Sequence, residues 1–426
     1  MTLLILMGSF FLLLIFGIPV AFALGISSLL TIIFEQLPPL IVFQRLSSGM
    51  SIFSLMAIPF FIYAGELMTH GGIANKLVTL ASKAIGHVRG GLGVVNVGTS
   101  MLFGGISGSA VADVSALGST LIPVMKKKGY DDDYSVNVTV TSATIGLTIP
   151  PSHNMIIYSI AAGGTVSISS LFLAGFIPGI LTGVLLMITA YVIAVKRGYK
   201  SEKFDGFLPL FYAFIGAIPG LMTAVIILGG VLSGIFTATE SGAIAVIYSI
   251  LVSTFFYKTL SWESFKLATK NAVKTTAMVL FIIASASSFA WLLALNDVPS
   301  QLFDIMQTIS SNPLVILLLI NLILLLLGTF MDMSPLIIIT TPIFLPVVVE
   351  LGMDPVQFGI MLMLNLGIGL VTPPVGSVLF VGCAVAKIPI EQTLKSIWPF
   401  YLALVAALMA VTYIPAVSMT LPKLFG

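Results

Sequence analysis

Long apolar segments alternate with short polar ones along the entire chain. A helix of about 20 apolar residues crosses the hydrocarbon core of a bilayer, so this pattern predicts an all-α polytopic membrane protein. The apolar segments are residues 2–34, 50–68, 91–104, 110–125, 134–165, 171–195, 207–232, 238–257, 273–295, 313–327, 335–349, 356–386 and 396–421. Gly17 and Pro19 interrupt the first segment, which is either one kinked helix or two short ones. The polar segment 197–206 lies near the middle, and we predict that it links two repeats.

One motif occurs in both halves of the chain. Residues 145–152 read IGLTIPPS, and residues 368–375, which follow 223 positions later, read IGLVTPPV. Two adjacent prolines remove backbone donors and clash with the preceding turn, so we expect each helix to break there. A broken helix at membrane depth is tolerated where it lines a cavity or is buried in protein. Matching breaks in a repeated chain indicate the binding site of a secondary transporter.

Two pairs of apolar segments are too short to span the bilayer one by one. They are 91–104 with 110–125, joined by 105–109, and 313–327 with 335–349, joined by 328–334. Helices of 14 to 16 residues rise only about 21–24 Å, whereas the hydrocarbon core is about 30 Å thick. Their polar, Gly-rich junctions favour turns inside the protein. We therefore predict two re-entrant helical hairpins whose tips lie near the midplane.

The distribution of basic residues predicts that the two repeats are inverted. If the hairpins open to opposite sides and the linker is cytoplasmic, 16 of the 18 basic residues are cytoplasmic and only Arg45 and Lys423 are not. The 16 are Lys76, Lys83, Arg89, Lys126, Lys127, Lys128, Lys196, Arg197, Lys200, Lys203, Lys258, Lys266, Lys270, Lys274, Lys387 and Lys395. The positive-inside rule requires such a bias. Residues 126–128 should then be cytoplasmic and residues 350–355 periplasmic.

Composition agrees with this class of protein. Hydrophobic residues make up 58% of the chain and charged residues 8%, and the mean hydropathy is +1.15, which excludes an ordinary soluble domain. The net charge of +2 gives no indication of nucleic-acid binding, and the single Cys383 excludes an intrachain disulfide. The N-terminal apolar segment lacks a basic n-region and a cleavage site, so we expect it to be the first membrane helix and not a signal peptide.

Two stretches have the character of interfacial helices. Residues 261–270 alternate aromatic and basic side chains at helical spacing, as a helix along the lipid headgroups does. Residues 40–46 are the expected counterpart in the first repeat. An ordinary loop helix without a mechanical role explains both stretches equally well.

Candidate chemistry indicates binding and not catalysis. The three histidines, His70, His87 and His153, form no Cys/His/Asp cluster at metal-ligand spacing. No glycine-rich phosphate loop occurs, which argues against an ATP-driven pump in this chain. Ser107 and Ser109 have no base near them in the sequence. We therefore do not expect an enzyme.

Both repeats place oxygen-bearing groups at the hairpin tips and helix breaks, and such oxygens suit a hard, singly charged cation. We predict one Na⁺ site in each repeat, with Na⁺ as the coupling ion. The expected Na⁺ ligands are Ser107, Ser109, Thr148, Pro150, Ser152, Gly328, Met331, Asp332, Gly369 and Thr372. The expected substrate contacts are Ser109, Ser152, Asn154, Ser334, Gly376 and Ser377. The alternative is that these groups only satisfy one another at helix ends.

The hairpins carry acidic residues but no basic ones. Among these acids, Asp332 is the one that we most expect to have a functional role. Asp113 either has such a role or is a partner for a helix terminus. Glu66 and Glu240 are expected to be structural. No Lys or Arg occurs in 90–125 or 275–386. An anionic solute would therefore be bound by helix N-termini and by bound cations.

Several motifs resemble the large membrane subunit of TRAP transporters, over nearly the whole chain. They are residues 58–66, 89–92, 103–113, 149–152, 237–240 and 367–376. At Ala238 the family often has proline. The resemblance implies a tripartite, ATP-independent importer in the bacterial inner membrane, in which Na⁺ drives the uptake of an organic acid. It also implies two protein partners, a periplasmic substrate-binding protein and a separate small four-helix membrane subunit.

The resemblance further implies an elevator-type fold similar to the ion transporter superfamily. The scaffold would comprise residues 1–80 and 207–296, the transport domain residues 81–196 and 297–426, and the linker residues 197–206. The chain is most similar to the sialic-acid members, although no motif separates these from the C4-dicarboxylate members. A stand-alone Na⁺/C4-dicarboxylate symporter of similar architecture is the alternative function.

Overall fold

The computed structural model describes residues 2–201 and 203–425, with only the backbone at residue 106. This described part is helical and contains no β-strand. Its first half contains α1 (Thr2–Ile15), α2 (Val20–Phe34), α3 (Leu40–Met50), α4 (Ala57–His70), α5 (Ile73–Ile85), α6 (Gly91–Ser107), α7 (Ala110–Asp113), α8 (Ser119–Lys127), α9 (Asp132–Ala143), α10 (His153–Ala161) and α11 (Ile168–Lys196). Its second half contains α12 (Phe207–Leu232), α13 (Ala238–Leu251), α14 (Trp262–Leu295), α15 (Val298–Ile309), α16 (Pro313–Gly328), α17 (Met333–Glu350), α18 (Pro355–Gly369), α19 (Ser377–Ala386), α20 (Ile390–Leu394), α21 (Trp398–Tyr413) and α22 (Pro415–Phe425).

Many of these helices are suited to a bilayer. Five of the described spans are long and apolar enough to cross it: α11, α12, α13 with its π-helical extension, α14 and α17. The number rises to eight if each bent pair of neighbouring helices is one span. The predicted class, an all-α polytopic membrane protein, is confirmed.

Both predicted hairpins and both predicted breaks are present. In the first hairpin, α6 turns at Gly108 into α7, and a π-helical turn over Val114–Gly118 leads on to α8. In the second hairpin, α16 leads into α17. The Pro-Pro pairs separate α9 from α10 and α18 from α19, and both Pro-Pro peptide bonds are cis.

The structure settles one alternative that the sequence left open and differs from the expected elements in two other places. The first apolar segment forms two helices, α1 and α2, which a turn at Gly17 separates. Residues 261–270 do not form a separate interfacial helix, because α14 continues unbroken through 262–295, a segment without Gly or Pro. The amphipathic helices α5 and α15 were not expected from apolar runs, and α5 crosses the predicted boundary between residues 80 and 81.

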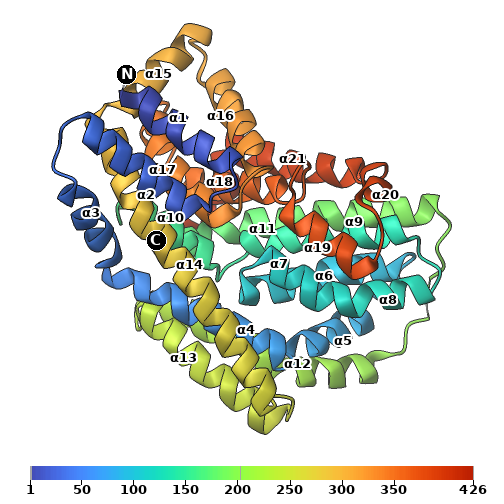
Figure 1. Ribbon diagram of the computed structural model, residues 1–426. Coiled ribbons are helices and arrows are strands. Elements are labelled where there is room, and N and C mark those ends of the chain that lie inside the picture. Colours follow the sequence, from blue (N-terminus) through green and yellow to red (C-terminus); the bar gives the residue numbers. More distant parts are fainter. Residues whose placement is uncertain (1, 202, 426) are drawn as a thin grey trace.

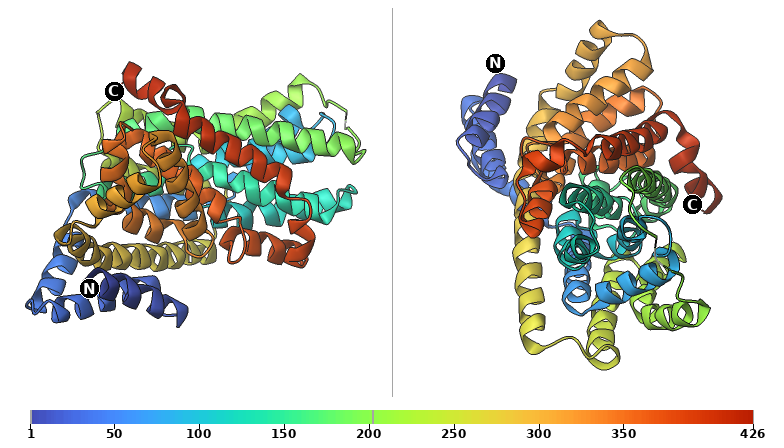
Figure 2. Two further views of the ribbon diagram at one scale, coloured as in Figure 1. Left: turned by 90° about the horizontal axis from the view of Figure 1, so that it is seen from above. Right: turned by 90° about the vertical axis from the view of Figure 1, so that its right-hand side faces the viewer.

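Helices from both halves of the chain pack together in one group beside α14. Helix α10 packs on α17, α9 on α19, and α11 on α18, α21 and α22, so elements of the two halves interlock. Helix α14 packs against α2, α3 and α4 and also reaches α17. Figure 1 shows α14 running diagonally past α2 and α10, and Figure 2 shows its nearly straight course along the edge of the molecule. The two hairpins thus face α14 across the interior.

A polar clamp joins the two halves at the end of α11. Arg197 donates to both carboxylate oxygens of Asp133 at 2.8 Å, and to Asp131 at 2.8 Å. Ser396, in the turn before α21, also donates to Asp133. Asn137 donates to Ser396 at 2.9 Å. Planar, bidentate pairing of this kind fixes orientation as well as distance, so the start of α9 is held against the segment before α21.

The predicted linker, 197–206, is described except for residue 202. It is tied to α5 through an ion pair between Lys83 and Asp205, whose N and O atoms are 2.5 Å apart. The hydrogen bond and charge of Lys83 lower the pKa of Asp205. Both side chains are exposed, so the pair orients the linker and adds little to stability.

Candidate functional site

Each hairpin meets a broken helix where two glycines touch. A Cβ added to Gly146 would lie 2.5 Å from the Cα of Gly104, and a Cβ added to Gly369 would lie 2.5 Å from the carbonyl carbon of Gly328. Both distances are far below van der Waals contact. Only glycine allows the backbones to approach this closely, so the backbones of hairpin and broken helix are in direct contact in both repeats.

A buried carboxylate lies at the first of these crossings. Asp113 is fully buried, and its Oδ1 accepts a hydrogen bond from Ser107. Its Oδ2 has no hydrogen-bond partner in the described part of the chain. A Cβ on Gly146 would lie 2.9 Å from this oxygen, and one on Gly104 would lie 3.2 Å from it. The unpaired oxygen therefore lies against both glycines.

The other residues predicted for the first site include two buried hydroxyls without partners in the described part of the chain. The Oγ1 of Thr148 and the Oγ of Ser152 are buried without a partner among the described residues. Ser152 is the N-cap of α10, yet its side chain does not cap that helix. The carbonyl of Pro150 faces Gly105, whose added Cβ would lie 2.7 Å from it. Ser109 differs from these residues, because its Oγ accepts from the amide of Ala112 and caps α7.

At the second crossing, the acidic residue lies at the tip of the hairpin. Asp332 is the N-cap of α17, and its Oδ1 accepts from Ser377 at 3.3 Å instead of capping that helix. Thr372 donates its hydroxyl to Ile368 in its own helix at 2.7 Å. Met331 is partly exposed at the tip. The second site is thus more open than the first.

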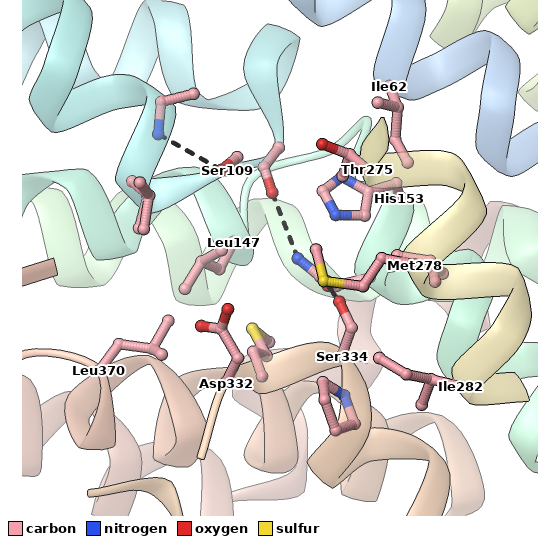
Figure 3. A pocket seen from close by; sticks show the side chains of 18 of the residues that line it. Ile62, Ser109, Leu147, His153, Thr275, Met278, Ile282, Asp332, Ser334 and Leu370 are labelled. Atoms are coloured by element: carbon pink, nitrogen blue, oxygen red, sulfur yellow. Dashed lines mark hydrogen bonds between the residues drawn. The ribbon is translucent and has the colours of Figure 1, made fainter. Parts of the chain in front are cut away.

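One side chain bridges the two hairpin tips. Asn154, at the start of α10, donates to the carbonyl of Gly108 in the first tip at 3.2 Å. Its carbonyl oxygen accepts from Ser334 in the second tip at 3.3 Å. Figure 3 shows Ser109 above and Asp332 and Ser334 below, with His153 beside the bridge. The tips and the first broken helix therefore share one polar surface.

This polar surface lines a pocket of about 510 Å³, a volume typical of small-molecule sites. The opposite wall belongs to α2, α4 and α14, and on α14 it presents Met278 and Ile282 with Thr275 (Figure 3). Glu66 adds an acid to this wall, and Asn271 donates to its carboxylate at 3.2 Å. No Lys or Arg occurs among the described residues that line the pocket.

The structure brings some of the predicted substrate contacts to the pocket and not others. Ser109, Asn154 and Ser334 line it. Ser152, Gly376 and Ser377 are not among the described lining residues. Ser377 instead contacts Asp332, and the amide of Gly376 donates to a tip carbonyl, that of Thr329, at 3.4 Å.

Sequence reasoning missed the opposite wall and the partner of Asp113. Nothing in the mainly apolar run of α14 marks Met278 and Ile282 as pocket residues, because a membrane helix carries apolar side chains toward lipid and protein as well as toward a pocket. Asp113 and Ser107 could have been paired from the sequence, since they lie six residues apart across one tight turn.

The comparisons with known proteins agree with this architecture. The family model for the tripartite ATP-independent periplasmic transporter, DctM component, matches residues 7–417. The chain is 37% identical to the C4-dicarboxylate TRAP transporter large permease protein DctM of Rhodobacter capsulatus, over 100% of both chains. It is 39% identical to the sialic acid TRAP transporter large permease protein SiaM of Vibrio cholerae, over 96% of both. The crystal structure of the Alcanivorax borkumensis YdaH transporter has a similar fold, with a TM-score of 0.64 over 87% of both chains at 14% identity.

The chain therefore belongs to the DctM component family of tripartite ATP-independent periplasmic transporters. It is a multi-pass protein of the bacterial inner membrane. Large permeases of this family function with a small membrane subunit and a periplasmic binding protein, and they are transport proteins.

Proposed function

We propose that this DctM-family permease imports an organic acid together with Na⁺, using two pseudo-symmetric Na⁺ sites and an elevator movement. We propose sialic acid as the first candidate for the substrate. The observation that carries the proposal is the buried carboxylate of Asp113, whose unpaired oxygen lies where the first hairpin crosses the first broken helix.

A buried carboxylate with one unpaired oxygen requires a cation or a proton, because burial of an uncompensated charge costs several kcal/mol. Ser107 is the one hydrogen-bond donor to Asp113 among the described residues. Further oxygens of the first broken helix are the hydroxyls of Thr148 and Ser152, unpartnered among the described residues, and the carbonyl of Pro150, which faces Gly105 of the hairpin. A set made of carboxylate, hydroxyl and carbonyl oxygens suits a hard cation, and Na⁺ is the singly charged one that we propose.

The second Na⁺ site follows from the repeat. Gly369 corresponds to Gly146, and it lies against the backbone of Gly328, whose carbonyl group is among the nearest atoms. Asp332 adds negative charge at the tip, and Thr372 adds a hydroxyl one turn from Gly369. Because this site is more open than the first, we expect the second ion to bind more weakly when substrate is absent.

The substrate would bind between the tips and the opposite wall. Asn154 and Ser334 are neutral hydrogen-bonding groups there, and no basic side chain is available in the described lining. The amides at the start of α10 and α17 and the two Na⁺ ions would offset the charge of an organic acid. Substrate affinity should therefore rise with Na⁺ concentration, and by linkage Na⁺ affinity should rise with substrate by the same factor.

Two features support an elevator. The hairpins and broken helices of both halves interlock into one packed group, and the bonds of Ser396 to Asp133 and Asn137, beside Arg197, link the two halves. The wall that faces this group is mainly apolar, and side chains such as Met278 and Ile282 form no directional bonds that a sliding movement would have to break.

The test is uptake in proteoliposomes that contain the permease and its small subunit, with the binding protein supplied outside. Labelled sialic acid and labelled succinate, a C4-dicarboxylate, are compared in Na⁺ and in choline. We expect Na⁺-dependent uptake of sialic acid. Uptake that is equal in choline would refute Na⁺ coupling, and uptake of succinate alone would replace the substrate. Uptake without the binding protein or the small subunit would instead identify a stand-alone symporter.

A further inference from the structure

Helix α16 contains a single polar side chain. Its sequence, PLVILLLINLILLLLG over Pro313–Gly328, is a run of leucine, isoleucine and valine that Asn321 interrupts. Asn321 is only 3% exposed. A face made of nearly identical apolar side chains packs about equally well in several registers, because no contact is unique to one of them. The register between this helix of the second hairpin and its neighbour therefore needs another determinant.

Asn321 is paired with a second buried asparagine, Asn365 in α18. The side-chain nitrogen of Asn365 donates to the side-chain oxygen of Asn321 at 2.8 Å and to the backbone carbonyl of Asn321 at 2.9 Å. Asn321 in turn donates to the hydroxyl of Thr412 in α21 at 3.2 Å. Asn365 is fully buried. Buried amides between membrane helices have no water to bond instead, so this pair favours the one register that brings both amides together.

The asparagine pair lies on the same helix faces as the glycine contact of the second site. Asn321 precedes Gly328 by seven residues, which is about two turns of α16. Asn365 precedes Gly369 by four residues, which is about one turn of α18. A slip of one turn, about 5.4 Å, would separate the two amides and would place a residue with a side chain against Gly328. The hydrogen bonds and the glycine contact therefore specify the same register.

The first repeat has a corresponding arrangement. Ser142 precedes Gly146 by four residues, the same spacing as in the second repeat, and it donates to the side-chain oxygen of Asn96 in α6 at 3.3 Å. Asn96 also donates to the hydroxyl of Thr139 at 2.6 Å. Both Asn96 and Ser142 are fully buried. In each repeat, a buried asparagine of the hairpin thus bonds to the residue one turn before the contact glycine.

We propose that these contacts, Asn321 with Asn365 and Asn96 with Ser142, hold each hairpin in register with its broken helix and thereby position the oxygens that bind Na⁺. The four side chains lie outside the expected Na⁺ ligands, so they act through the glycine contacts. A lone asparagine in the core of a coiled coil sets register in the same way, at a cost in stability. The register rests on the hydrogen bonds, whereas its consequence for Na⁺ rests on the proposed function.

The double variant N321V/N365A removes the second pair while one larger and one smaller side chain keep the total volume nearly unchanged. Replacing both partners of a buried hydrogen bond by apolar groups is often nearly neutral for stability. Among the described partners of the pair no donor is left unpaired, because Thr412 still donates to Leu408 at 2.8 Å. The matched control T412V removes a different buried hydrogen bond of Asn321. In this control Asn321 keeps its contact with Asn365 and its bond to Leu317 at 3.0 Å.

The readout is the thermal unfolding midpoint of the purified complex of the permease with its small subunit, measured as Na⁺ replaces choline at constant ionic strength. An ion that binds the folded state raises this midpoint, so the titration reports Na⁺ affinity without any solute. The upper part of the titration reports the second site, which we expect to bind Na⁺ more weakly than the first. We expect N321V/N365A to move this part to Na⁺ concentrations at least about tenfold higher, and T412V to stay within about twofold of the unmodified complex.

A titration of N321V/N365A that matches the unmodified complex would overturn the inference and leave the proposed Na⁺ sites intact. An equal shift in T412V would also overturn it, because a general loss of packing would then explain both. If the unmodified complex shows no rise with Na⁺, the proposed Na⁺ sites themselves fail, and the inference fails with them. The variant N96V decides the question if the double variant does not fold. It leaves Ser142 bonded to Thr139 at 3.1 Å, and it should shift the lower part of the titration, whereas an unchanged lower part would refute the proposal.

Discussion

Gly369→Ala tests the close contact between the second hairpin and the second broken helix. The added Cβ would lie 2.5 Å from the carbonyl carbon and 2.8 Å from the carbonyl oxygen of Gly328. Ordinary carbon contacts are about 3.5–4.0 Å long, so the two backbones must separate by about 1 Å. Such overpacking costs about 1–3 kcal/mol. Part of this cost is offset, because alanine favours a helix by up to about 1 kcal/mol over glycine.

The displacement should affect Na⁺ binding more than folding. A binding constellation tolerates errors of about 0.5 Å, and a shift of about 1 Å exceeds that tolerance. We expect the Na⁺ concentration that half-saturates uptake to rise at least about tenfold, which corresponds to about 1.4 kcal/mol. The assay is the initial rate of uptake by the complete reconstituted transporter as a function of Na⁺, with size-exclusion chromatography to confirm folding.

Gly367→Ala is the matched control in the same helix. The atoms nearest to its added Cβ are side-chain atoms, Leu147 Cδ1 at 3.3 Å and Thr144 Cβ at 3.6 Å, which can adjust. Its Na⁺ dependence should therefore stay close to that of the unmodified protein. Gly146→Ala should reproduce the effect of Gly369→Ala at the first site. If Gly369→Ala has a normal Na⁺ dependence, the glycine contact does not shape an ion site and the reasoning is wrong.

Three further predictions concern the acid, the topology and the clamp. Asp332→Asn keeps the size of the side chain but removes its charge, so transport should fall severely while the protein still folds and inserts; a normal uptake rate would contradict its role in binding a cation. Single cysteines at Lys127 and Asp354, in a Cys383→Ala background, should react with impermeant reagents from opposite faces of the membrane, and labelling from one face would exclude inverted repeats. Arg197→Lys should destabilise the purified complex by about 1–2 kcal/mol, because lysine cannot keep a bidentate pairing that is only partly exposed; an unchanged thermal unfolding midpoint would show that the clamp is dispensable.

The sequence by itself determined those features that depend on local backbone chemistry and on helix length. Pro150 and Pro373 remove backbone donors wherever the chain places them, so both breaks were predictable. Short apolar runs on either side of a Gly-rich junction predicted both hairpins, although α17, with 18 residues, is longer than the expected run and long enough to cross a bilayer. The internal repeat and the uneven distribution of basic residues could be read directly from the positions of these residues in the sequence. These features need no knowledge of which helices touch.

Tertiary structure alone decided how the functional groups meet. Asn154 contacts Ser334 across 180 positions of sequence, and no local pattern marks that pairing. The role of α14 as the far wall of the pocket was equally hidden, because the residues of a membrane helix are apolar whether they face lipid, protein or a binding site. Backbone hydrogen bonding is decided within a few residues, whereas a site assembled from both halves of the chain depends on how distant helices pack. For that reason the sequence predicts the broken helices but not the wall of the pocket that α14 forms.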